Sequence, residues 1–285
     1  MPLVTSEKLL IDAQEGGYAV GAFNAENMEM IQAIIQAAEE LKAPVIIQTT
    51  PGTIKYGGLR YYYSNVYAGA SMASVPVVLH LDHGSSFELA SQAYREGYSS
   101  IMIDGSKLPF EQNIAVSKKV AEMCSSSNIP VEAELGRVGG KEDDTVSIED
   151  IYTDPEKAVE FVKETGISSL AVAIGTAHGF YAKTPVLDVN RLTEIRKVVD
   201  IPLVLHGASG LTDEQVTECI KRGICKVNFA TELRDAFSKG VKKAISDNPN
   251  VIDPKTYNKE GIKCVKELVK HKMIVCGCTN ICKQI

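Results

Sequence analysis

Eight short, apolar, strand-like segments recur along the chain about every thirty residues, and this regularity limits the possible folds more than any other feature. The segments are YAVGAF, PVIIQT, VPVVLHL, SSIMID, VEAEL, SSLAVAIG, PLVLH and CKVNFA. Helical periodicity lies between them in MEMIQAIIQAAEEL, FEQNIAVSKKVAEMC and LTDEQVTECIKRG, the last beginning with a Thr212 cap and ending at Gly223. This alternation predicts an α/β fold, a single (β/α)8 TIM barrel over residues 1–285.

The alternative fold is a doubly wound open sheet, which usually carries a glycine-rich phosphate loop after its first strand. The first turn of this chain reads GAFNAENM instead. With 45% apolar and 23% charged residues, 285 residues also suffice for one large barrel. We expect residues 250–285 to form an extra helical tail beyond the eighth unit.

Charge and hydropathy exclude several partners. The net charge is −6 and the basic residues are scattered, which argues against nucleic-acid binding. No apolar stretch approaches the roughly eighteen residues that span a bilayer, and the amino terminus lacks the pattern of an export signal. We therefore expect a cytoplasmic protein whose seven cysteines are reduced thiols, including Cys276, Cys278 and Cys282 of the tail.

Three histidines stand at the ends of predicted strands. His83, His178 and His206 each precede a glycine and follow a short apolar run. Because the carboxyl ends of barrel strands meet on one face, these imidazoles are expected to lie together. Three neutral imidazoles with an open fourth position form the ligand set of a catalytic zinc, and Asp82 places a carboxylate beside that metal. We interpret His80, on Asp82's side of its strand, as a buried hydrogen-bonding partner.

One connection is unusually long. After the fifth strand, GRVGGKEDDTVSIEDIYTDP runs for about twenty residues and combines Gly139 and Gly140 with a cluster of carboxylates. Such a segment is either a solvated acidic surface loop or a lid. We interpret it as a lid that brings Glu142 inward during turnover, and Asp143 and Asp144 as residues that cap or solvate the loop.

The last predicted βα turns have the features of a phosphate site, because backbone N–H groups and a helix amino terminus favour an anion there. The glycines of these turns could instead serve only tight connections. The candidate substrate-binding residues are Gly179, Gly207, Ala208, Ser209, Asn228, Phe229, Ala230 and Thr231.

Several motifs together carry a family resemblance over nearly the whole chain. HLDHG, EAELG followed by GGKEDD, GTAHG, LVLHGASG and KVNFATEL resemble the class II ketose-bisphosphate aldolases. GTAHGFYAKTP and GICKVNFATEL are similar to tagatose-bisphosphate members, whereas DHGSSFE is similar to fructose-bisphosphate members, so the preferred sugar stays open. The resemblance implies a lyase of carbohydrate metabolism that cleaves a ketose 1,6-bisphosphate to dihydroxyacetone phosphate and glyceraldehyde 3-phosphate.

The resemblance also implies roles for individual residues. His83, His178 and His206 would hold zinc, Asp82 would handle the proton of the C4 hydroxyl, and Glu142 the other proton. The candidate phosphate segments match the family's dihydroxyacetone phosphate site. Asp104 and Glu134 match positions for a second or displaced metal, and Glu132 would be a supporting carboxylate. A homodimer or homotetramer is expected by analogy, and assistance from a monovalent cation stays open.

Some positions depart from the family pattern. Lys183 lies one residue further from His178 than the phosphate-binding lysine of many relatives, and Lys255 follows Asp253-Pro254 where an arginine is common. Asn24 and Thr50 either reach the substrate's far half or cap their own turns. The alternative functions are an aldolase for another phosphorylated keto sugar, of the inositol-breakdown type, and a non-catalytic accessory barrel subunit.

Overall fold

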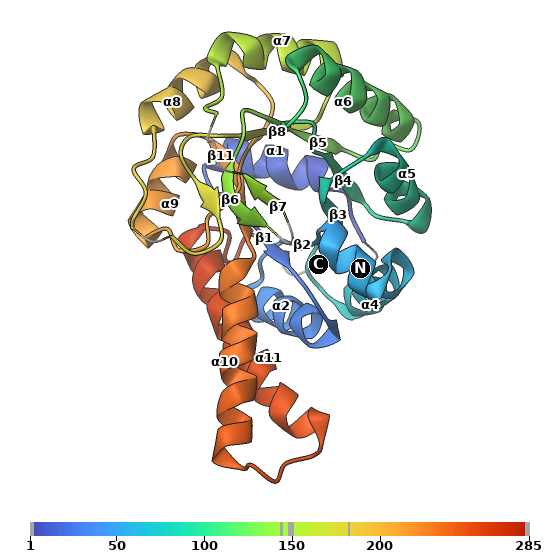
Figure 1. The fold of residues 1–285 in the computed structure, drawn as a ribbon, viewed down its shortest axis with the longest axis vertical. Helices are drawn as coiled ribbons and strands as arrows, with labels where there is room; N and C mark the ends of the chain where they lie inside the picture. The colour runs from blue at the N-terminus through green and yellow to red at the C-terminus, as the bar shows by residue number, and fades with distance from the viewer. Residues whose placement is uncertain (1–2, 143–144, 148–150, 182, 283–285) are drawn as a thin grey trace.

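The computed structural model describes residues 3–142, 145–147, 151–181 and 183–282. Eight parallel strands close into a barrel in the order β1-β11-β10-β8-β5-β4-β3-β2, which confirms the predicted (β/α)8 fold (Figure 1). Each corresponds to one of the predicted segments. The strands are β1 (Val20–Asn24), β2 (Val45–Thr49), β3 (Val77–Gly84), β4 (Ser100–Ile103), β5 (Val131–Leu135), β8 (Ser169–Val172), β10 (Leu203–Leu205) and β11 (Ile224–Phe229).

Helices surround the barrel and cover the outward faces of its strands (Figure 1). They are α2 (Met28–Leu41), α3 (Pro51–Gly57), α4 (Leu59–Met72), α5 (Phe87–Glu96), α6 (Phe110–Ser125), α7 (Pro155–Thr165), α8 (Val189–Val198), α9 (Asp213–Lys221) and α10 (Thr231–Asp247). The predicted Thr212 cap is present as a reciprocal pair: Thr212 Oγ1 accepts from the Gln215 amide, and the Gln215 side chain accepts from the Thr212 amide.

Helix α1 (Ser6–Gly16) closes the amino-terminal end of the barrel. Its Leu10 and Ala13 pack in one buried cluster with Val20 of β1, Ile46 of β2 and Val78 of β3. Side chains alternate along a strand, so these strand residues face the barrel interior while their neighbours pack under the helices. Apolar packing thus fills this end of the barrel and leaves polar side chains to the carboxyl end.

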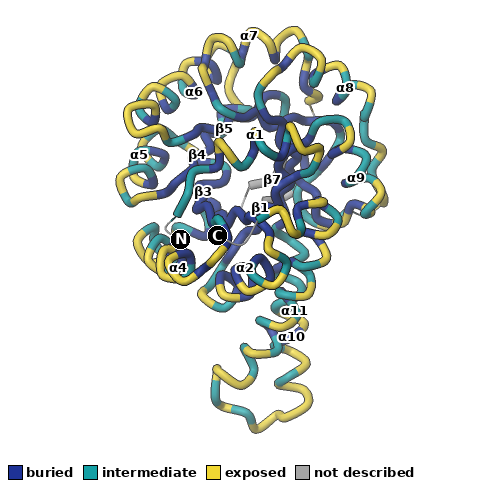
Figure 2. Tube along the Cα trace, turned by 180° about the vertical axis from the view of Figure 1, so that it is seen from behind, coloured by how far each residue is buried: buried dark blue, intermediate teal, exposed yellow. Residues whose placement is uncertain are grey.

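Residues after α10 form the predicted helical tail, α11 (Pro254–Val275), which packs antiparallel to α10 as a projecting helical hairpin (Figures 1 and 2). The helices approach closely at glycines: a Cβ on Gly240 would lie 2.5 Å from the Glu260 carbonyl oxygen. The tip of the hairpin is exposed, whereas the later part of α11 packs on α2 beside the barrel (Figure 2).

A small second sheet, in the order β7-β6-β9, lies over the carboxyl end of the barrel (Figure 1). Its strands are β6 (Gly139–Glu142), β7 (Thr145–Ser147) and β9 (Ala177–His178). The long connection after β5 therefore contains two antiparallel strands, β6 and β7, and its two glycines begin β6, in which Gly140 pairs with His178. Among the described helices, none combines the length and apolar character needed to cross a membrane.

Candidate metal centre and active site

The structure brings the three predicted histidines together at the carboxyl end of the barrel. His83 lies near the end of β3, His178 ends β9 and His206 directly follows β10. The ring centroid of His83 lies 4.6 Å from that of His206 and 5.0 Å from that of His178. One ring nitrogen from each residue lies within 4.8 Å of the other two. The ligand set expected from the sequence is thus assembled as one group.

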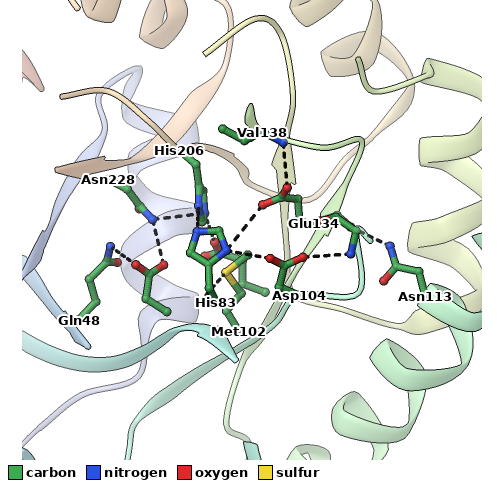
Figure 3. A network of polar contacts seen from close by, with 12 residues as sticks. Gln48, His83, Met102, Asp104, Asn113, Glu134, Val138, His206 and Asn228 are labelled. Carbon is green, nitrogen blue, oxygen red and sulfur yellow. Dashed lines mark hydrogen bonds and ion pairs between the residues drawn. The ribbon is translucent and has the colours of Figure 1, made fainter. Parts of the chain in front are cut away.

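Carboxylates fix the tautomers of two of these rings (Figure 3). His83 Nδ1 lies 3.0 Å from Asp104 Oδ2, and His206 Nε2 lies 2.9 Å from Glu132 Oε1. A carboxylate accepts a hydrogen bond, so these ring nitrogens carry the protons. The opposite nitrogens, His83 Nε2 and His206 Nδ1, then carry lone pairs, and they face each other at 2.8 Å.

Two lone pairs at this distance repel each other, and a cation that accepts both removes the repulsion. Burial lowers the pKa of His206 below its ordinary value, so the neutral, ligating form of this imidazole is favoured. Imidazole nitrogens suit zinc, and a carboxylate behind a ligating histidine is the usual arrangement in zinc sites. The residues present therefore fit a zinc ion held by His83, His178 and His206.

A second group that could hold a metal consists of His83, Asp104 and Glu134. Burial raises the pKa of Glu134 to about 7, and the charge of Asp104 adds to the rise. Glu134 Oε1 accepts from the Val138 amide at 3.2 Å, whereas its Oε2 has no hydrogen-bond partner within the described residues. A buried carboxylate oxygen without a donor suits a displaced or second cation.

Three amide side chains orient the buried carboxylate of Asp82. Oδ2 accepts from Asn24 Nδ2 and Gln48 Nε2, both at 3.0 Å, and Oδ1 accepts from Asn228 Nδ2 at 3.2 Å. The donors come from β1, β2 and β11, and two of them, Gln48 and Asn228, are labelled in Figure 3. Asn228 Nδ2 also lies 3.2 Å from His206 Nε2, so the side chain that donates to Asp82 lies against the histidine group.

Beneath the histidines, a buried polar network crosses the barrel interior. Lys226 Nζ lies 2.9 Å from Glu132 Oε2 and 3.4 Å from His80 Nε2, and His80 Nδ1 lies 2.8 Å from Ser100 Oγ. Burial opposes the charge of Glu132, but Lys226 and His206 outweigh it and hold the pKa of this carboxyl well below its usual range. Burial, followed by the Lys226 charge, lowers the pKa of His80. His80 is the hydrogen-bonding partner expected from the sequence.

The candidate phosphate segments border a pocket beside the histidines. Its lining residues are Asn24, His178, Gly179, Gly207, Ser209, Asn228, Ala230, Thr231 and Arg234. Gly207 has a φ of 66°, and a Cβ there would lie 2.6 Å from the Ala177 carbonyl oxygen, so both backbone conformation and space require glycine. Ala208 and Phe229 do not line the pocket, because their side chains are buried in the hydrophobic core.

The structure describes some of the remaining predicted residues and not others. The backbone of Glu142 ends β6, but its side chain and residues Asp143 and Asp144 lie outside the described residues. Lys183 is exposed. Thr50 caps α3 by accepting from the Thr53 amide at 3.3 Å. Asn24, which also borders the pocket, donates to Asp82.

The tail thiols Cys276 and Cys278 lie in surroundings that disfavour metal binding. Cys276 and Cys278 are buried, and burial raises the pKa of Cys278 to about 12, which disfavours the thiolate. Within the described part of the chain, neither group of candidate metal ligands includes a cysteine. These observations agree with the interpretation of the tail cysteines as reduced structural thiols.

Sequence reasoning missed three residues of this region: Gln48, Lys226 and Arg234. Gln48 and Lys226 were each visible as a polar side chain within an apolar strand segment, which is the available signal for a residue facing a polar barrel interior. Arg234 lies in the first turns of α10, lines the pocket and forms an ion pair with Glu26 at 2.6 Å. Nothing in its local sequence distinguishes it from a surface arginine.

Comparison with known proteins gives concordant matches. The sequence model of the family described as "Fructose-bisphosphate aldolase class-II" matches residues 4–281. The crystal structure of the YdjI aldolase from Escherichia coli K12 is 36% identical, with a TM-score of 0.88 over 99% of this chain and 100% of that one. A putative fructose-1,6-biphosphate aldolase from Coccidioides immitis is 32% identical, with a TM-score of 0.89 over 96% of each chain.

A more distant structure shares the fold. Fructose-bisphosphate aldolase (Fba) from Campylobacter jejuni is 23% identical, with a TM-score of 0.83 over 98% of this chain and 97% of that one. In each of these three structures the match extends over nearly the full length of both chains.

Proposed function

The chain belongs to the class II fructose-bisphosphate aldolase family and is a metal-dependent lyase, and from this premise we propose its reaction. We propose that the enzyme uses zinc to cleave a ketose 1,6-bisphosphate, tagatose or fructose 1,6-bisphosphate, reversibly into dihydroxyacetone phosphate and glyceraldehyde 3-phosphate. The observation that carries the proposal is the pair of facing ring nitrogens, His83 Nε2 and His206 Nδ1, 2.8 Å apart and beside His178.

Zinc, when bound, acts as a Lewis acid that stabilises negative charge developing on a substrate oxygen. The chain supplies the proton transfers. Asp82 takes the proton of the C4 hydroxyl, for which Asn24, Gln48 and Asn228 hold its carboxylate in one orientation. Glu142, in the connection above the barrel, carries out the other proton transfer. Asp104 and Glu134 provide a second cation position next to His83.

The substrate's phosphate fits the pocket formed by Gly179, the Gly207–Ser209 turn and the start of α10. This pocket offers backbone amides, the Ser209 and Thr231 hydroxyls and the positive end of a helix dipole.

We further propose a cytoplasmic homodimer or homotetramer. Its support is membership of the family. Sedimentation velocity at micromolar protein would measure the assembly, and a purely monomeric species would contradict it.

The reaction is tested by measuring zinc-dependent cleavage of tagatose and fructose 1,6-bisphosphates side by side, with dihydroxyacetone phosphate release coupled to a reductase and a chelated control. A preference for one sugar names the substrate. Cleavage of neither sugar by zinc-loaded protein would refute the proposed substrates and point to another phosphorylated ketose or an accessory role. Borohydride trapping of a substrate imine would contradict the metal mechanism.

Two substitutions separate metal binding from proton transfer. Asp82→Ala is expected to retain zinc but lose cleavage, because the carboxylate is not a member of the ligand group. His206→Ala is expected to lose both, because it removes one of three ligands. Metal content by mass spectrometry and turnover would be measured on the same preparations; wild-type turnover by Asp82→Ala would contradict its assigned role.

A further inference from the structure

A buried lysine of the tail helix α11 contacts a glutamate that in turn contacts the Gly207–Gly210 turn beside the pocket. This turn is called the phosphate turn below. The Lys272 side chain is only 5% exposed, and its Nζ lies 2.9 Å from Glu232 Oε2. The same ammonium lies 5.2 Å from the centre of the Phe229 ring, which ends β11. A lysine is rarely buried to this extent without a specific partner. Lys272 lines no part of the pocket, so any influence on a ligand passes through Glu232.

The other carboxylate oxygen of Glu232 contacts the phosphate turn. It lies in the first turn of α10, between the pocket residues Thr231 and Arg234, and its Oε1 accepts from the Gly210 amide at 2.8 Å. Gly210 closes the turn that begins at Gly207 and has a φ of +88°, a conformation that side chains rarely adopt. One carboxylate therefore joins the turn to the tail helix.

The negative charge of Glu232 would weaken the binding of the proposed phosphate ligand. A phosphate at the start of α10 would lie near Glu232, and two like charges in a poorly solvated region repel each other. The Lys272 ammonium opposes that repulsion, and it also fixes the carboxylate on the Gly210 amide. Without the lysine, Glu232 would be a partly buried, uncompensated anion beside an anion-binding site.

We propose that Lys272 is a positioning residue for phosphate binding: it neutralises Glu232 and holds it on the Gly210 amide, so that the Gly207–Gly210 turn accepts a phosphate group. The inference deepens the proposed function, since it concerns the same pocket. It assigns the tail helix a specific task at the active site, in addition to its packing on α2 and α10.

The test measures the affinity of zinc-loaded, full-length protein for inorganic phosphate by isothermal titration calorimetry. We expect Lys272→Met to weaken phosphate binding about tenfold or more, the fold-change expected for losing an interaction with a charged group. Glu232→Gln should bind phosphate at least as tightly as the wild type, because the amide keeps an oxygen for Gly210 and removes the negative charge. The double variant should recover to within about threefold of wild type.

The opposite effects of the two single substitutions distinguish this role from a merely structural one. A pair that only stabilised the fold would make both single variants bind phosphate more weakly, and that result would overturn the inference. Phosphate affinity unchanged in Lys272→Met, or a double variant as weak as Lys272→Met, would also overturn it. Lys270→Met is the matched control, because Lys270 lies on the same helix but pairs with Glu40 on the surface.

Cleavage kinetics keep this inference separate from the proposed reaction. In Lys272→Met, KM for the bisphosphate should rise while kcat stays within about twofold, since the interaction binds the phosphate in the ground and transition states alike. Should Lys272→Met not fold, Glu232→Gln and the double variant still decide the sign of the charge effect. Phosphate binding that depends on Lys272 in a protein that cleaves neither sugar would sustain the inference and reject the reaction.

Discussion

The buried ion pair between Lys226 and Glu132 offers a quantitative test of the network beneath the metal centre. The lysine side chain is 1% exposed and the glutamate 2%, and their charged atoms lie 2.9 Å apart. Lys226→Met removes the ammonium but leaves Glu132 buried with its charge uncompensated on that side. Breaking a fully buried pair in this way costs about 3–5 kcal/mol of folding free energy.

For a chain of this length the entropy of unfolding is about 0.6 kcal/mol per degree, so the expected fall in Tm is about 5–8 °C. Differential scanning calorimetry with saturating zinc, and again after chelation, would measure it. The double variant Lys226→Met with Glu132→Gln should regain more than half of the loss, because the amide oxygen still accepts from His206 and no charge stays buried.

Lys239→Met is the matched control for this experiment. Lys239 Nζ lies 2.6 Å from Asp235, closer than in the buried pair, but its side chain is 74% exposed. A solvated pair contributes at most about 1 kcal/mol, so the expected fall in Tm is under about 2 °C. If Lys226→Met lowered Tm no more than Lys239→Met, or if the double variant regained nothing, the reasoning from burial would be refuted.

Three further predictions concern single residues. Gln48→Leu removes one of the donors to Asp82, and loss of a hydrogen bond to a charged group should lower kcat about tenfold to a hundredfold without changing zinc content; equal turnover in coupled assays would contradict this. Because the pKa of Glu134 is raised to about 7, its protonated form contributes stability that is complete below its ordinary pKa and is lost as pH rises through 7. In chelated protein, the Tm of the wild type should therefore fall relative to that of Glu134→Gln between pH 5.5 and 8. Plots of Tm against pH that run parallel for the two proteins would contradict the raised pKa of Glu134. Thr212→Ala breaks the reciprocal cap with Gln215 and should cost about 1 kcal/mol in urea unfolding, whereas Thr212→Ser should cost little.

Much of the fold could be predicted because its signals are local. The helix expected over MEMIQAIIQAAEEL coincides with α2, where Asn27 caps the amino terminus and Lys42 adopts the left-handed conformation that ends it. The strand-end histidines could be grouped because the carboxyl ends of barrel strands meet wherever the strands lie in the chain. Neither prediction required knowledge of which strands are neighbours.

The contacts behind these histidines could not be predicted from local patterns. Lys226 meets Glu132 across 94 residues, and Lys272 meets Glu232 only because α11 folds back along α10. A polar residue within an apolar strand indicates a polar interior, but its partner depends on closure of the barrel and on the stagger between strands. The sequence of the long connection likewise does not reveal that it pairs with β9.

The pairing between β6 and β9 joins the proposed metal ligand His178 to the strand that ends at the proposed acid–base residue Glu142. His178 pairs with Gly140, two residues before Glu142, and a Cβ on Gly140 would lie 2.2 Å from the His178 carbonyl oxygen. A metal bound at His178 and a sugar bound at the neighbouring strand would therefore act on the same pair of strands. By thermodynamic reciprocity, any factor by which a bound metal changes the affinity for the sugar is also the factor by which the sugar changes the affinity for the metal.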